Sequence, residues 1–135
     1  MGQIIGIDSG IFMYVWDDNP EFYNASAKIL GLVEQGHCEG IFAQIGLIEI
    51  LTGPKKEGLY SLAMSYKNKL LNFPNLSINS LNENIITIAS DMRAKYNLKT
   101  PDAIHIATAI DAGASKFYTN DKSLKKVKEI KIQTL

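Results

Sequence analysis

Short apolar runs alternate with segments of helical periodicity along the chain, and this alternation constrains the fold more than any other feature. The runs cover residues 3–8, 40–44, 76–78, 116–118 and 130–133. Each run has the length of a buried strand. Strands that alternate with helices form βαβ units, in which parallel strands make one sheet covered by helices on both faces. The sequence therefore predicts the α/β class, with a central, mostly parallel sheet.

Start and stop signals place helices between these strands. Asparagine and the Ser/Glu capping box are typical of helix starts, proline favours the first helical position, and glycine follows helix ends. The expected starts are Asn19-Pro20, Pro54, the capping box of Ser80 and Glu83, and Thr100-Pro101-Asp102, and the expected stops are Gly36 and Gly113. A helical turn containing Glu49 is also expected directly after the second strand.

Length and composition predict a single domain over residues 1–135. Hydrophobic residues make up 46% of the chain and charged residues 21%, which excludes disordered, collagen-like and coiled-coil classes. The single cysteine, Cys38, cannot form an intramolecular disulfide and fits a reducing compartment. The longest apolar run, 41–51, contains Gln44 and Glu49, so no membrane span is expected. Without a signal-peptide pattern at the start, we expect a cytoplasmic protein.

The formal charge is zero in total but divided between two parts of the chain. Residues 1–49 hold seven acids and one lysine, for −6, and residues 50–135 hold seven acids and thirteen bases, for +6. A zero total argues against a generic nucleic-acid binder, yet it can hide an acidic focus beside a basic surface. Five lysines in the last fourteen residues either solvate one face and protect an edge strand at 130–132, or belong to a basic groove.

Four carboxylates are expected to meet at one edge of the sheet. Asp8 ends the first strand, Glu49 lies about one turn into the helix after the second strand, Asp102 lies in the first turn of its helix, and Asp121 follows the strand 116–118. Ligands of open parallel sheets bind beyond the carboxyl ends of the strands. Helical side chains lean toward the helix N-terminus, which directs Glu49 back to that edge.

Clustered carboxylates repel one another, so such a group must bind protons or hold cations. Oxygen ligands alone favour Mg²⁺ or Mn²⁺, and these ions promote phosphodiester hydrolysis. Each acid also has a structural interpretation of its own: Asp102 can favour a helix dipole, Asp121 can belong to a turn, and Glu49 can be a surface charge. Asp8 is hardest to explain in this way, because a charge directly after a buried strand needs a partner.

The segments around these acids resemble a known family. They are Ile7-Asp8-Ser9, Glu49 between Ile48 and Ile50, Thr100-Pro101-Asp102-Ala103-Ile104-His105-Ile106-Ala107-Thr108-Ala109, and Tyr118-Thr119-Asn120-Asp121. In this order, and over essentially the whole chain, they resemble PIN-domain ribonucleases and most of all the VapC-type toxins of type II toxin–antitoxin pairs. The Asp102–Ala109 segment and Thr119-Asn120-Asp121 are the most specific parts.

The resemblance implies a PIN-like three-layer α/β/α sandwich and a Mg²⁺- or Mn²⁺-dependent endoribonuclease that hydrolyses RNA phosphodiester bonds. It implies that the catalytic and metal-holding residues are Asp8, Glu49, Asp102 and Asp121, and that Ser9, Thr119 and Asn120 support these ligands or contact phosphate. It also implies a homodimer and a small antitoxin whose tail enters the acidic groove. Family members often place Ser and Thr ahead of the glutamate, where this chain has Ala43 and Gly46, and this departure bears on activity more than on fold.

Two other functions stay open at this point. A PIN-type RNA-processing nuclease outside toxin systems would share the chemistry, and a non-catalytic PIN-fold module would bind RNA or protein without turnover. Among the remaining residues, His105 is interpreted as a packed, structural histidine and His37 as a surface residue. The aromatic stretch at 12–16 fits either a partner surface or core packing.

Overall fold

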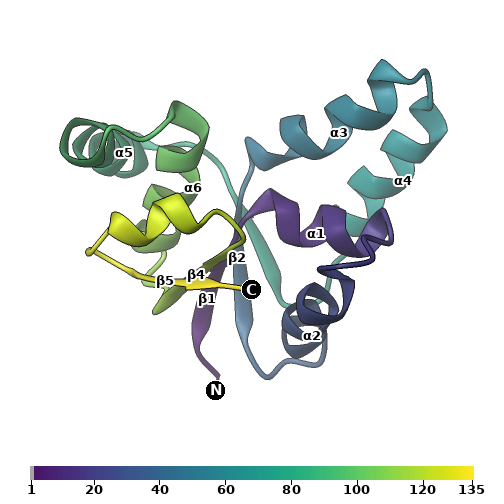
Figure 1. Cartoon of the computed structure of the whole chain (residues 1–135), viewed down its shortest axis with the longest axis horizontal. Coiled ribbons are helices and arrows are strands. Elements are labelled where there is room, and N and C mark those ends of the chain that lie inside the picture. The colour runs from purple at the N-terminus through teal and green to yellow at the C-terminus, as the bar shows by residue number, and fades with distance from the viewer. Residues whose placement is uncertain (1) are drawn as a thin grey trace.

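The computed structural model describes residues 2–135, which form one sheet of five parallel strands (Figure 1). The strands are β1 (Ile4–Ile7), β2 (Glu39–Ala43), β3 (Leu76–Asn79), β4 (Lys116–Thr119) and β5 (Lys131–Thr134). Their order in the sheet is β3-β2-β1-β4-β5, and every neighbouring pair is parallel. The α/β class is therefore confirmed, and the sheet is parallel throughout.

Helices cover both faces of this sheet. In the described chain they are α1 (Ser9–Trp16), α2 (Tyr23–Glu34), α3 (Gly46–Lys56), α4 (Tyr60–Leu71), α5 (Glu83–Tyr96), α6 (Thr100–Asp111) and the short 3₁₀ helix η1 (Lys122–Lys126). Figure 1 shows α1 to α4 on one side of the sheet, and α5, α6 and η1 on the other. The architecture is a three-layer α/β/α sandwich, as the resemblance implies.

Each face of the sheet has its own hydrophobic core. Ile5 and Ile7 of β1 pack with Phe12 and Phe42 beneath α1 to α4, and the two phenylalanine rings meet edge to face at 5.1 Å. The other core lies beneath α5, α6 and η1, and its main members are Ile85, Met92, Ile106, Phe117 and Leu124. Alternate residues of a strand face opposite sides, so Ile5 and Ile7 of β1 both enter this first core.

Gly6, between those two isoleucines, brings α6 close to the centre of the sheet. A Cβ at this position would lie 2.6 Å from Cβ of Ala109 and 2.8 Å from Cδ1 of Phe117. The missing side chain lets α6 pack directly against β1 and β4. Asp102 lies in the first turn of this helix, and Asp8 follows β1.

Several expected boundaries differ from those observed. Helix α1 was not anticipated, because its start signal is Asp8 itself, which caps the helix. Helix α2 begins at Tyr23, since the side-chain oxygen of Asn19 accepts hydrogen bonds at 2.9 Å from the N–H groups of Glu21 and Phe22 and forms a turn around Pro20.

Two further helix starts predicted from the sequence, at Pro54 and Ser80, are wrong. Pro54 lies inside α3 and does not open the next helix, which begins at Tyr60 after a turn at Gly58 with a φ of 76°. The cap of α5 is Asn82, whose side chain accepts from the Ile85 N–H at 2.9 Å, so Ser80 does not form the expected capping box. The edge strand near residue 130 is confirmed as β5. Within residues 2–135, no helix has the length and apolar character that a membrane crossing needs.

Candidate active site

All four predicted acids stand at the beginnings of helices. Asp8 caps α1 and Asp121 caps η1, while Glu49 and Asp102 lie in the first turns of α3 and α6. A helix N-terminus presents free N–H groups and the positive end of the helix dipole, which favours negative charge. The four acids therefore share the same local setting, the start of a helix.

Asp8 is held from two neighbouring strands. Its N–H donates to the carbonyl of Tyr118 at 2.9 Å, which continues the pairing of β1 with β4. Oδ1 accepts from the N–H of Ser9 at 2.8 Å and from the Ser9 hydroxyl at 3.5 Å, and Oδ2 accepts from the Thr119 hydroxyl at 2.7 Å. The Thr119 oxygen in turn accepts from the N–H of Asp121 at 3.1 Å. The side chain of Asp8 is thus fixed in orientation, and its support is tied to the backbone of a second acid.

Glu49 makes the shortest side-chain contact of the site. Its Oε1 lies 2.5 Å from Nε2 of His105, whose side chain is 1% exposed against 37% for the glutamate. Burial raises the pKa of Glu49, but the hydrogen bond and attraction from His105, with a hydrogen bond from Ser9, outweigh it. The pKa of Glu49 therefore lies below its ordinary value, and the carboxyl stays ionised.

Asp102 shows that the four acids share one electrostatic field. Burial is the largest cause that raises its pKa, and the negative charges of Asp8, Asp121 and Glu49 raise it further, against a lowering by His105. All four acids are therefore close enough for their charges to interact. The expected meeting of the carboxylates at one edge of the sheet agrees with this coupling.

The three polar residues expected to assist the acids take different positions. Thr119 is fully buried and Ser9 nearly so, and both hydroxyls contact Asp8 as described above. Asn120 turns away from the acids: its amide donates to the hydroxyl of Tyr14 in α1 at 3.1 Å. Because its hydroxyl is buried, Thr119 supports a carboxylate and does not face a phosphate.

Sequence reasoning did not find the pairing of His105 with Glu49. It placed the histidine correctly as a packed side chain, which is 2% exposed, but assigned it no partner. The available signal was its spacing of three residues from Asp102, which puts both side chains on one face of α6.

The sequence model of the PIN domain matches residues 5–130. The chain belongs to the PIN-domain family. A comparison with curated protein sequences finds no match.

Solved structures show the same PIN fold. VapBC2 from Rickettsia felis, bound to a DNA fragment of its promoter, matches with a TM-score of 0.78 and 17% identity over 97% of this chain and 98% of that chain. DNA-bound VapBC from Salmonella typhimurium matches with a TM-score of 0.76 and 14% identity over 99% and 98%. A toxin–antitoxin complex from Klebsiella pneumoniae matches with a TM-score of 0.67 and 20% identity over 96% and 95%. The predicted resemblance to PIN domains and the three-layer fold are confirmed.

The donor set of this PIN domain fits a divalent cation by its chemistry. Members of the family are nucleases that typically use divalent metal ions. Carboxylate oxygens are the ligands that Mg²⁺ and Mn²⁺ prefer, and the negative charges of Asp8, Asp121 and Glu49 add to burial in raising the pKa of Asp102. As the side chains of residues 2–135 stand, no three of the types His, Cys, Asp and Glu are grouped so that they could hold one ion. The carboxylates would therefore have to close around a cation to bind it.

The departure at Gly46 has a packing reason. A Cβ at this position would lie 2.2 Å from Cζ of Phe42 and 2.9 Å from Cε1 of His105. The two rings, 5.7 Å apart between centroids, fill the space that a serine or threonine would need. In this PIN domain the smaller residue ahead of Glu49 thus makes room for the histidine that contacts it.

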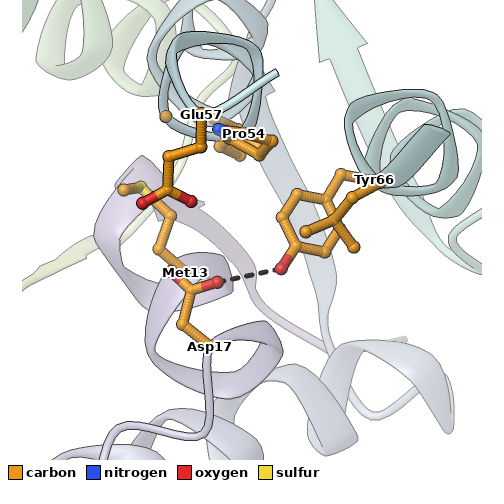
Figure 2. A pocket seen from close by; sticks show the side chains of 8 residues that line it. Met13, Asp17, Pro54, Glu57 and Tyr66 are labelled. Carbon is orange, nitrogen blue, oxygen red and sulfur yellow. Dashed lines mark hydrogen bonds between the residues drawn. The ribbon is translucent and has the colours of Figure 1, made fainter. Parts of the chain in front are cut away.

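A separate pocket of about 310 Å³ lies between α1 and the hairpin of α3 and α4 (Figure 2). Of the described residues that line it, none is one of the four acids. Its lining is mainly apolar, with two carboxylates: Met13, Asp17, Ile50, Gly53, Pro54, Glu57, Leu62 and Tyr66. The Tyr66 hydroxyl donates to Oδ1 of Asp17 at 2.9 Å, and burial together with this carboxylate raises the pKa of Tyr66 to about 12. The hydrogen bond ties α4 to the end of α1.

Proposed function

We propose that this PIN domain is a metal-dependent endoribonuclease of the VapC type, which hydrolyses RNA phosphodiester bonds. Asp8, Glu49, Asp102 and Asp121 would hold Mg²⁺ or Mn²⁺. The observation that carries the proposal is the placement of all four acids at helix starts in a chain that the PIN-domain family model matches over residues 5–130. Four coupled carboxylates without a matching set of bases call for a cation.

The residues of the chain have distinct tasks in this proposal. When bound, the divalent cation would supply charge neutralisation and Lewis acidity at a phosphate oxygen. Ser9 and Thr119 hold the carboxylate of Asp8 in one orientation from two sides. Asp8 and Asp121 stand at the starts of α1 and η1, where the positive end of a helix dipole favours negative charge.

An antitoxin is the protein partner in this proposal. The solved structures with the same fold include VapBC complexes and a toxin–antitoxin complex. Large apolar side chains are exposed on α3 and α4, among them Ile48, Tyr60 and Met64, and would supply apolar surface for such a partner. A homodimer and a cytoplasmic location, where RNA and a small antitoxin would be met, belong to the same proposal.

Cleavage of RNA by the purified chain tests the function. The protein, freed of any copurifying partner, is incubated with total RNA and Mn²⁺ or Mg²⁺, with and without EDTA. Asp8→Asn should abolish cleavage while the protein stays folded, and Asp91→Asn, on the exposed surface of α5, should cleave as the wild type does. Cleavage that survives EDTA or Asp8→Asn would contradict the assignment.

The same experiment separates the other functions. RNA binding without metal-dependent turnover would favour a non-catalytic PIN-fold module. Metal-dependent cleavage by a chain whose gene has no small partner gene beside it would favour an RNA-processing nuclease outside toxin systems.

A further inference from the structure

His105 is the buried titratable group that stands closest to the acids without being one of them. It lies on α6, with its ring tilted 40° against Phe42 and with Cε1 facing the bare Cα of Gly46. The side chain is almost fully removed from solvent. Packing on both sides leaves the ring one orientation, with Nε2 toward Glu49.

The surroundings of the two ring nitrogens decide where the proton sits. Nδ1 is buried and finds no hydrogen-bond partner among residues 2–135. A proton on Nδ1 would be buried without an acceptor, which costs free energy. Nε2 faces an ionised carboxylate oxygen, which can only accept. Nε2 therefore carries the proton and donates it to Oε1 of Glu49.

We propose that His105 is a positioning residue, whose Nε2–H holds Oε1 of Glu49 so that Oε2 stays free for the divalent cation. The inference rests on the proposed function, because it assigns Glu49 to the metal. His105 is not itself a ligand: Nε2 is engaged by the carboxylate, and Nδ1 is enclosed by the core.

Two properties of Glu49 make such a support useful. Its side chain is partly exposed, so solvent competes for its carboxylate. It also has three rotatable bonds, and a ligand that is already held in place loses less conformational freedom when the ion binds. Outer partners of metal ligands act in this way in general, by fixing the ligand and maintaining its charge.

Two substitutions of His105 distinguish positioning from packing. The amide nitrogen of glutamine reaches the place of Nε2, whereas that of asparagine reaches only the place of Nδ1. Mn²⁺ affinity is measured by titration calorimetry on the full chain without RNA, together with Tm. We expect His105→Asn to weaken Mn²⁺ binding by roughly 10–100-fold and His105→Gln to retain most of the affinity. His37→Gln, in an exposed loop, is the matched control and should bind as the wild type does.

The outcomes distinguish the positioning role of His105 from the proposed metal-dependent function. Equal Mn²⁺ affinity for wild type and both His105 variants, with a lowered Tm, would assign His105 a packing role alone and overturn the proposal. Absence of Mn²⁺ binding by the wild type would overturn the proposed function, and the positioning role with it.

A measurement on the wild type covers the case in which the variants do not fold. Long-range ¹H–¹⁵N correlation spectra of the His105 ring should show Nε2 protonated. The opposite tautomer would remove the donor from Glu49 and overturn the proposal.

Discussion

The Thr119 hydroxyl donates a 2.7 Å hydrogen bond to Oδ2 of Asp8, although the two residues are 111 positions apart in the chain. They are brought together because β1 and β4 are neighbours in the sheet. The same oxygen accepts from the N–H of Asp121, so one buried hydroxyl connects two of the four acids.

Thr119→Val removes this hydroxyl and keeps the shape of the side chain. It leaves Oδ2 of Asp8 and the N–H of Asp121 without their partner, and we expect a loss of roughly 1–2 kcal/mol in the free energy of unfolding. Urea denaturation measures the change. Thr119→Ser keeps the hydroxyl and should recover much of the loss; equal stability of the Val and Ser variants would show that the hydrogen bonds contribute nothing.

Asp102→Asn should stabilise the protein at neutral pH. The folded state raises the pKa of Asp102, so it binds this proton more tightly than the unfolded chain does. Stability is therefore lost as pH rises from the ordinary aspartate pKa of about 3.9 through the raised value. Because the side chain is partly solvated, we expect Tm at pH 7 to rise by only ~1–3 °C.

Thermal denaturation of wild type and Asp102→Asn across pH 3 to 8 checks the sign. The difference in Tm should vanish below the ordinary aspartate pKa, where both forms are uncharged. Mn²⁺ should raise Tm more for the wild type than for the variant, because the ion relieves the same repulsion. A variant less stable than the wild type at pH 7 would contradict the destabilising effect of burial and neighbouring negative charge on ionised Asp102.

Gly46→Ser tests the packing around Glu49. The added Cβ would meet Cζ of Phe42 at 2.2 Å, so we expect a loss of about 1–3 kcal/mol from overpacking. Gly53→Ser is the matched control: it lies in the same helix, α3, and a Cβ there meets nothing within 4 Å. If both variants unfold at the same urea concentration, the space at residue 46 is larger than the structure indicates.

Tyr66→Phe should loosen the junction of α1 and α4. It deletes the 2.9 Å hydrogen bond to Asp17, and we expect a loss of about 1 kcal/mol at pH 7. The folded pKa of about 12 lies above the unfolded value of about 10, so this stability is present below pH 10 and is lost as pH rises toward 12.

The difference between wild type and Tyr66→Phe should therefore shrink or reverse in alkaline urea titrations. Trp16, the single tryptophan of the chain, stacks on Tyr66 with 5.1 Å between ring centroids, so its fluorescence reports the junction directly. A difference that stays constant from pH 8 to 12 would show that the hydroxyl does not contribute through Asp17.

Much of the fold was predictable because it depends on local pattern. The five apolar runs match the five strands within one or two residues, and their alternation with helices gave the parallel sheet. The four acids follow from the same logic, since residues at strand ends and helix starts gather at one edge.

What could not be predicted depends on choices between equal local signals or on contacts distant in sequence. Asn82 and not Ser80 caps α5, although both residue types are favoured at helix caps. Helix α1 lacks polar residues that would show a helical stripe, so its apolar sequence left the element open. The contact of His105 with Glu49 joins residues 56 positions apart, and no spacing rule specifies it.

The central position of β1 bears on how the chain is made. β1 lies between β2 and β4 in the sheet, so one of its edges stays open until β4 has been synthesised. Asp8 can therefore gain its support from Thr119 only after residues 116–121 have emerged. The acid cluster is therefore assembled only late in translation, after most of the chain has been made.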